Sequence, residues 1–143
     1  MTVGLVIVSH SARLAEGVVE LAGQMAQGKV AIAAAGGTSD GALGTSVEKI
    51  VAALHEVDGP DGTIVLLDMG SAVMATEMAV ESFVQDQRRN VVISSAPLVE
   101  VAMVAAVESS IGNSLQEVVD AAASAHTLPK IHTSNNPYHS SNA

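Results

Sequence analysis

Four short runs of apolar residues recur along the chain, and a longer stretch with a different pattern follows each. The runs are rich in β-branched residues or Leu and do not alternate with polar positions, which is typical of strands buried on both faces. They cover residues 3–8, 30–34, 63–67 and 90–93. We therefore predict four strands that lie inside a sheet covered on both sides.

The stretches between and after these runs carry apolar residues three or four positions apart, which predicts helices. The recurring residues are Leu14, Val18, Leu21 and Met25; Leu43, Val47, Ile50 and Leu54; Ala72, Ala75, Ala79 and Phe83; Leu98, Val101, Ala102 and Ala105; and Leu115, Val118, Val119 and Ala122. The order of elements is thus β-α-β-α-β-α-β-α-α. Because crossovers between parallel strands are right-handed, this order predicts an α/β fold: a mainly parallel, doubly wound sheet of about four strands with helices on both faces. We expect one domain over residues 1–128 and a flexible C-terminal tail over 129–143, where the periodicity ends.

Composition excludes several classes of function. The formal net charge is −9 with six Lys and Arg, and the chain has one Tyr, one Phe and no Trp. Few cations and few stacking rings argue against binding to nucleic acid or to an anionic membrane. The absence of cysteine rules out disulfides, thiolate catalysis and zinc-thiolate sites. No apolar run is long enough to span a bilayer, and the first residues lack the features of a signal peptide, so we expect a cytoplasmic protein.

Polar residues that could carry chemistry follow the predicted strands directly. In an open parallel sheet, ligands gather beyond the carboxyl ends of the strands, near the point where the strand order reverses. His10 follows the first strand, and Asp68 follows the third. An imidazole is nucleophilic at one nitrogen when its other nitrogen keeps a proton that an acceptor holds. We predict that Asp68 binds Nδ1–H of His10 and orients the ring, so that Nε2 accepts a phosphoryl group.

Small polar residues near these two would bind the phosphoryl oxygens. Candidates are Ser11 beside His10, Gly37 and Thr38 in the loop after the second strand, and Ser71 after the third. Hydroxyl and backbone N–H donors at the start of a helix suit phosphate. We predict no metal ligands.

Other interpretations of the same residues remain open. A lone His before a helix is often only a cap, and His10 would then be structural in a non-catalytic interaction module. A histidine phosphatase or mutase would need several arginines near the phosphate, and Arg13 alone is close in sequence. The sequence also lacks a dinucleotide-binding glycine turn after the first strand and the acidic cluster of a receiver domain.

Met69, Met74 and Met78 lie near one another after the third strand. They could form a docking surface, but methionines at helical spacing are more often buried, and we interpret them as core residues.

Three motifs in order resemble one known family. Residues 3–11, residues 35–38 with Gly41, and residues 66–72 are similar to the DhaM family, the phosphoryl-donor subunits of bacterial phosphoenolpyruvate-dependent dihydroxyacetone kinases. Residues 95–100 also fit, and the resemblance extends over residues 1–128. DhaM subunits are similar to the mannose-type IIA domains of the sugar phosphotransferase system (PTS).

The resemblance implies a specific reaction. Enzyme I and HPr would pass phosphoryl from phosphoenolpyruvate to His10, and the phosphohistidine would rephosphorylate ADP held with magnesium on DhaL. DhaL would then phosphorylate dihydroxyacetone bound to DhaK. The chain itself would bind no cofactor, Asp68 would orient the imidazole, and two copies would form a homodimer. Because the chain ends before any HPr-like domain, we expect a separate HPr as donor.

One departure bears on the substrate. Residues 69–72 read Met-Gly-Ser-Ala, where the mannose-type sugar domains carry a Trp-Gly-Gly-Ser type of sequence. This favours the dihydroxyacetone branch, with the IIA domain of a mannose-family sugar permease as the alternative.

Overall fold

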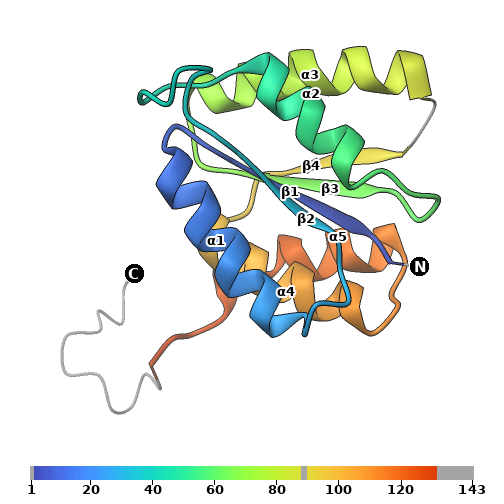
Figure 1. The fold of residues 1–143 in the computed structure, drawn as a ribbon. Helices are drawn as coiled ribbons and strands as arrows, with labels where there is room; N and C mark the ends of the chain where they lie inside the picture. Colours follow the sequence, from blue (N-terminus) through green and yellow to red (C-terminus); the bar gives the residue numbers. More distant parts are fainter. Residues whose placement is uncertain (1, 88–89, 132–143) are drawn as a thin grey trace.

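A four-stranded parallel sheet forms the centre of the protein (Figure 1). The structure, a computed structural model, describes residues 2–87 and 90–131. The strands lie in the order β2-β1-β3-β4. They are β1 (Gly4–Ser9), β2 (Ile32–Gly36), β3 (Thr63–Leu67) and β4 (Val91–Ser94). The predicted fold class is confirmed, and the limits of the predicted strands differ from the observed ones by two residues at most.

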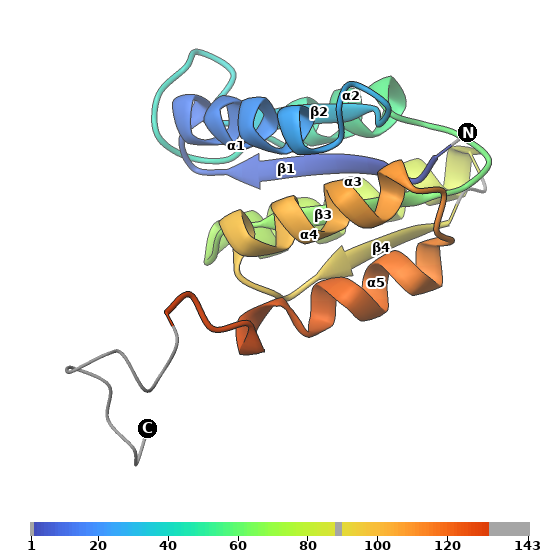
Figure 2. The same ribbon diagram turned by 90° about the horizontal axis from the view of Figure 1, so that it is seen from below.

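Helices cover both faces of the sheet, in the predicted order along the chain. Helices α2 (Val47–Glu56) and α3 (Ser71–Gln87) lie on one face. The opposite face carries α1 (Ala12–Met25), α4 (Leu98–Ser110), α5 (Leu115–Ala123) and a short 3-10 helix (Ala125–Thr127), which Figure 2 shows from below. The molecule therefore has three layers with a separate apolar core on each side of the sheet.

The two central strands explain why their sequences are continuously apolar. Leu5 and Ile7 of β1 pack into the core beneath α1, α4 and α5, whereas Val6 and Val8 pack into the core beneath α2 and α3. Every residue of β1 and β3 is buried. Because successive side chains of a strand point to opposite faces, a strand covered on both sides needs apolar residues at every position.

The exposed side of α1 differs from the expectation. Leu14, Leu21 and Met25, which we expected to face the core with Val18, are between 44% and 45% exposed, whereas Val18 is 5% exposed. The core face of α1 is built around Val18 from small side chains, namely Ala15, Ala22 and the adjoining Ala26. At Ala15 the reason is the close approach of α1 to the end of β2, since a Cβ built at Gly36 would lie 2.8 Å from Cβ of Ala15.

Two other apolar predictions are wrong. Leu43 is 80% exposed because α2 begins only at Val47, after the N-cap Ser46 accepts a hydrogen bond from the backbone N–H of Lys49. Met69, Met74 and Met78 are 73%, 70% and 61% exposed, respectively. The core face of α3 is instead made of Ala72, Ala75, Ala79 and Phe83, as the periodicity predicted.

The boundary between domain and tail at residue 128 stays a prediction. Near it, Lys130 Nζ lies 2.8 Å from Glu100 Oε2 on α4. The rest of the predicted tail, residues 132–143, lies outside the described residues. Within the described part of the chain, no helix combines the length and the hydropathy needed to cross a membrane.

A substitution at Gly36, which ends β2, tests the close approach of α1 to the sheet. A Cβ at this position would lie 2.4 Å from the backbone oxygen of Ser11 and 2.8 Å from Cβ of Ala15. We expect Gly36→Ala to lower the free energy of unfolding by about 1–3 kcal/mol, because the clash displaces α1. Gly17→Ala is the matched control: a Cβ there meets no atom within 4 Å. That helical substitution should raise stability by up to ~1 kcal/mol. Urea titration of both variants measures the difference, and equal midpoints would contradict the proposed packing.

Candidate active site

His10 and Asp68 lie together where the strand order reverses. The chain runs from β1 outward to β2, then crosses back to β3 on the other side of β1 and continues to β4. β1 and β3 are hydrogen-bonded neighbours, with Val8 opposite Leu67 at their ends. His10 and Asp68 follow these strand ends closely, so the sheet itself brings the two side chains into contact. This is the position at which open α/β sheets bind their ligands.

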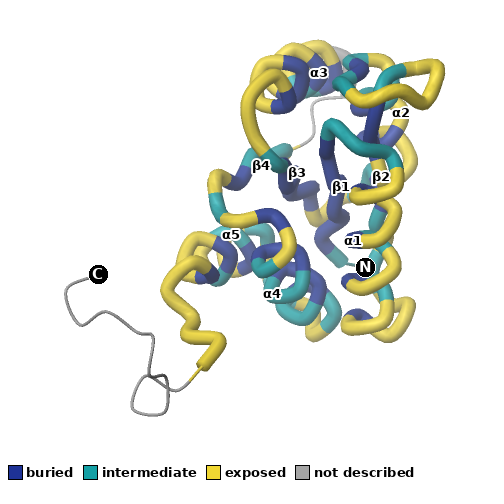
Figure 3. Tube along the Cα trace, turned by 90° about the vertical axis from the view of Figure 1, so that its left-hand side faces the viewer, coloured by how far each residue is buried: buried dark blue, intermediate teal, exposed yellow. Residues whose placement is uncertain are grey.

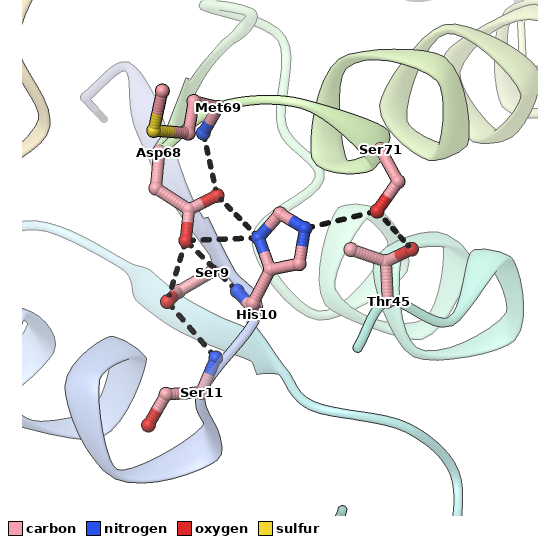
Figure 4. A network of polar contacts seen from close by, with 7 residues as sticks. All are labelled: Ser9, His10, Ser11, Thr45, Asp68, Met69 and Ser71. Carbon is pink, nitrogen blue, oxygen red and sulfur yellow. Dashed lines mark hydrogen bonds and ion pairs between the residues drawn. The ribbon is translucent and has the colours of Figure 1, made fainter. Parts of the chain in front are cut away.

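The Asp68 carboxylate accepts hydrogen bonds from three directions (Figure 4). The Ser9 hydroxyl and the backbone N–H of His10 each donate to Oδ2 at 2.9 Å. The backbone N–H of Met69 donates to Oδ1 at 2.7 Å. Nδ1 of His10 lies 3.1 Å from Oδ1 and 3.2 Å from Oδ2. The carboxylate is thereby held in one orientation, with the imidazole against it.

These contacts set the ionisation of Asp68. Burial raises its pKa, but the hydrogen bonds from the backbone N–H groups of His10 and Met69, and from the His10 and Ser9 side chains, outweigh burial and leave the pKa below its ordinary value of 3.8. Asp68 is therefore an anion at neutral pH and can only accept hydrogen bonds.

An acceptor at Nδ1 determines the tautomer of His10. Since the ionised carboxylate has no proton to donate, Nδ1 must carry the hydrogen, and in the neutral ring Nε2 then has a free lone pair. Nε2 lies 2.9 Å from Oγ of Ser71 at the start of α3, and the Ser71 hydroxyl donates to it. Thr45 Oγ1 lies 3.4 Å from the same Oγ. His10 is 36% exposed, so its nucleophilic nitrogen is at the surface.

The backbone around His10 is fixed by the loop between β2 and α2. The N–H of Gly37 donates to the carbonyl oxygen of Ser9 at 3.1 Å, and the N–H of Gly44 donates to that of His10 at 2.9 Å. On the other side, Gly70 has a φ of +64° and lies next to the imidazole, where a Cβ would be 3.9 Å from Cε1. A left-handed residue with no side chain lets the chain turn from Asp68 into α3 beside the ring.

The predicted phosphate-binding residues divide into two groups. Ser71 contacts His10 directly. Ser11 instead caps α1, since its hydroxyl accepts from the backbone N–H of Leu14 at 3.1 Å. The Thr38 hydroxyl bonds Asp40, lowering the pKa of that carboxyl, and accepts from Ala42 N–H at 3.1 Å. A phosphate-binding role for Ser11, Gly37 and Thr38 therefore stays a prediction that no contact with the imidazole supports.

Three contributors were missed. Ser9 donates to Asp68, Thr45 adjoins Ser71, and Gly44 fixes the His10 backbone. Ser9 adjoins His10 in the sequence and could have been found there, since an inward-facing polar residue at a strand end needs a partner. Thr45 and Gly44 belong to a loop whose path no local pattern specifies. Among residues 2–87 and 90–131, no three His, Cys, Asp or Glu side chains are grouped so that they could hold a metal ion.

Comparison with known proteins identifies relatives over most of the chain. Residues 4–119 match the family described as PTS system fructose IIA component (EIIA-man). The phosphoryl donor subunit DhaM of the PEP-dependent dihydroxyacetone kinase from Escherichia coli is 40% identical over 120 residues, 82% of this chain. The chain spans only 25% of that relative. The corresponding subunit of kinase 2 from Listeria innocua is 32% identical over 124 residues, which are 87% of this chain and 99% of that relative.

A solved structure has the same fold. The crystal structure of a protein of unknown function is 34% identical, with a TM-score of 0.76, and the match covers 86% of this chain and 94% of the other. The three-layer arrangement is therefore shared with a relative of nearly the same length.

Asp68→Asn tests the ionised acceptor. The substitution removes the charge and places an amide donor among N–H and O–H donors, so the free energy of unfolding should fall by about 1–3 kcal/mol at pH 7. Because the folded pKa of Asp68 lies below 3.8, its contribution is present above that value and is lost as the pH falls through the folded pKa. The stability difference from the native chain should thus be largest near neutrality and shrink below pH 3.8. Urea titrations across this range measure it, with Ser71→Ala as a control that keeps the native pH dependence. Parallel curves for Asp68→Asn and the native chain would contradict the assignment.

Proposed function

The chain belongs to the EIIA-man family, described as the PTS system fructose IIA component, and we propose that it carries a phosphoryl group transiently on His10 as the phosphoryl donor of a dihydroxyacetone kinase. The observation that carries this proposal is the pairing of Nδ1 with Asp68, which leaves Nε2 as the free nucleophile at the protein surface. The names of the DhaM relatives support the dihydroxyacetone branch.

The first step moves phosphoryl onto Nε2. The donor is phosphorylated HPr: its N–P bond breaks, its nitrogen keeps the electron pair, and the lone pair of Nε2 forms the new bond to phosphorus. The Nδ1–H stays on the ring and is held by Asp68, which stabilises the positive charge that develops on the imidazole. The Ser71 hydroxyl, released from Nε2, turns to donate to a phosphoryl oxygen.

The second step returns Nε2 to its starting state. A terminal oxygen of ADP on the DhaL subunit attacks phosphorus, the Nε2–P bond breaks, and the electron pair returns to Nε2 as ATP forms. DhaL, with DhaK, then phosphorylates dihydroxyacetone. In this scheme Mg-ADP belongs to DhaL, this chain binds neither nucleotide nor metal, and the exchange takes place in the cytoplasm. Positioning and electrostatics suffice for such transfers.

We also propose that two copies associate. β4 is an edge strand of the sheet, so one side of its backbone is open to another strand. Val91, Val92 and Ile93 are only half-buried, in contrast to the fully buried central strands. A homodimer in which β4 of one copy pairs with, or is covered by, the other copy would bury this apolar surface.

Phosphoryl transfer from labelled phosphoenolpyruvate tests the function. The purified chain is incubated with enzyme I and HPr, and the product is examined for acid-labile, base-stable label, which is characteristic of phosphohistidine. DhaL with ADP is then added as a chase. We expect label on the native chain that leaves with DhaL–ADP, and no label on His10→Ala. His126→Gln is the matched control, because His126 is an exposed histidine whose Nδ1 lies 2.9 Å from the nearby carbonyl oxygen of Ala123.

The other outcomes discriminate between alternatives. If the label is not transferred to DhaL–ADP but is transferred to a sugar permease, the chain is a phosphoryl carrier, but dihydroxyacetone is not the final acceptor. No label on the folded native chain, with active HPr, would leave a non-catalytic interaction module with a structural His10.

Ser71 and Thr38 can be separated by their effects on phosphorylation. Ser71→Ala removes the hydroxyl that lies 2.9 Å from Nε2, and we expect the rate of phosphoryl uptake to fall about tenfold, the loss of one well-placed donor. Thr38→Val should reduce the rate by less than about threefold, because the Thr38 hydroxyl is already engaged with Asp40 and Ala42. Single-turnover kinetics with phosphorylated HPr measure both. Equal losses would instead support the predicted phosphate-binding role of Thr38.

A further inference from the structure

Lys49, in the first turn of α2, donates to a backbone carbonyl rather than to a carboxylate. Its Nζ lies 2.9 Å from the carbonyl oxygen of Gly36, the last residue of β2. Glu16 and Glu56 line the same pocket as Lys49. Within the described part of the chain, neither of these carboxylates forms an ion pair with the ammonium group. The position of Nζ is therefore set by a neutral acceptor, although anionic groups line the same pocket.

The peptide unit between Gly36 and Gly37 is hydrogen-bonded at both ends. Its carbonyl accepts from Nζ of Lys49, and its N–H donates to the carbonyl oxygen of Ser9 at 3.1 Å. Gly36, Gly37 and Ser9 are all buried, whereas Figure 3 shows the loop before α2 as largely exposed. Because a peptide unit is planar and polarisable, a cation at its oxygen makes its N–H a stronger donor.

A second peptide unit continues from Ser9 to the Asp68 carboxylate. The carbonyl of Ser9 and the N–H of His10 belong to one peptide unit, and this N–H donates to Oδ2 of Asp68 at 2.9 Å (Figure 4). The series of hydrogen bonds thus runs from a cation through two peptide units to an anion, and we call it the Lys49–Asp68 path. Because the two charges polarise the peptide units in the same direction, each hydrogen bond strengthens the others.

The last hydrogen bond of the path has a large effect on Asp68. Burial raises the pKa of this carboxyl, and among the groups that lower the pKa the N–H of His10 has the largest effect. The same hydrogen bond fixes Oδ2 in a carboxylate whose two oxygens lie 3.1 Å and 3.2 Å from Nδ1 of His10. A group that strengthens this N–H donor therefore acts on the imidazole through Asp68.

Building on the carrier function proposed above, we propose that Lys49 is a positioning residue for the transfer of a phosphoryl group to His10. Its ammonium group strengthens the backbone donor that holds the Asp68 carboxylate. The carboxylate in turn holds Nδ1–H and stabilises the positive charge that develops on the ring as Nε2 is phosphorylated. A neutral side chain in place of Lys49 would leave the path without its cation, and no contact between Lys49 and the phosphoryl group is required.

Lys49→Met tests the charge, because Met keeps an unbranched side chain and lacks the ammonium group. Phosphoramidate is the donor, so that no protein partner is needed: its P–N bond breaks and ammonia leaves as Nε2 bonds phosphorus. We expect labelling to slow about three- to tenfold. Lys49→Arg should keep most of the native rate, since a guanidinium also donates to a carbonyl. Lys29→Met is the matched control, because Lys29 is exposed before β2 and its described hydrogen bonds use backbone atoms. A native rate for Lys49→Met, or an equal loss in Lys49→Arg, would overturn the proposal.

A double-mutant cycle shows whether Lys49 acts through Asp68. In the Asp68→Asn background, Lys49→Met should slow labelling by phosphoramidate by less than about twofold further, because the carboxylate on which the path acts is already absent. The same loss in both backgrounds would mean that Lys49 acts independently of Asp68, and it would contradict the proposal. Urea titration of each variant establishes that the rates are compared between folded proteins.

Amide proton chemical shifts test the path without any phosphoryl transfer. A stronger hydrogen bond moves an amide proton downfield, so Lys49→Met should move the amide protons of Gly37 and His10 upfield, and Lys29→Met should leave both in place. A change confined to Gly37 would show that the path ends before Asp68 and would overturn the proposal. If neither phosphoramidate nor phosphorylated HPr labels the native chain, the carrier function itself is wrong, and the two amide shifts still decide whether Lys49 is coupled to Asp68.

Discussion

The hydrogen bonds to the Asp68 carboxylate are the constraint on which the site depends. Alone, a buried carboxylate would be driven toward its neutral form, and a neutral acid could donate to Nδ1 as easily as accept from it. The donors from Ser9, His10 and Met69 remove this ambiguity by keeping Asp68 ionised. Only then is the proton fixed on Nδ1 and the lone pair on Nε2. The chemistry of the histidine is thus decided by backbone groups that the sheet has placed.

The sheet places them because β1 and β3 are adjacent. Their parallel pairing, with Val8 opposite Leu67, brings the residues that follow these two to the same edge of the sheet. A slip of one residue would exchange the side chains of the two cores, so that Leu5 and Ile7 would face α2 and α3 in place of Val6 and Val8. Small side chains on α1 and the absence of a side chain at Gly36 then allow the helix to lie close behind His10. Packing far from the imidazole therefore positions the imidazole.

This dependence explains which parts could be predicted from the sequence. The strands, their order along the chain and the meeting of His10 with Asp68 follow from apolar runs and from the rule that ligands gather at strand ends, and all of these are found. The face of α1 was not predictable from spacing, because Leu14 and Ala15 both fit a helical period and only the close approach of β2 selects the alanine. The exposed methionines were misread for a related reason. Met74 and Met78 are four positions apart, as are Ala75, Ala79 and Phe83, so helical spacing alone does not show which of the two stripes on α3 faces the core.

The hydrogen-bond donor at Nε2 of His10 helps to explain why a phosphorylated form of this histidine would be short-lived. The described contact there is a neutral hydroxyl, Ser71, rather than an arginine or lysine. A neutral hydrogen bond contributes about 0.5–1.5 kcal/mol, and a charge-assisted one about twice as much. A cationic clamp would stabilise the phosphorylated state and raise the barrier to passing the group on. A carrier must be phosphorylated and dephosphorylated with little net change in free energy. A hydroxyl that orients the phosphoryl group without holding it strongly meets that requirement, and it leaves binding energy to be supplied by the partner protein.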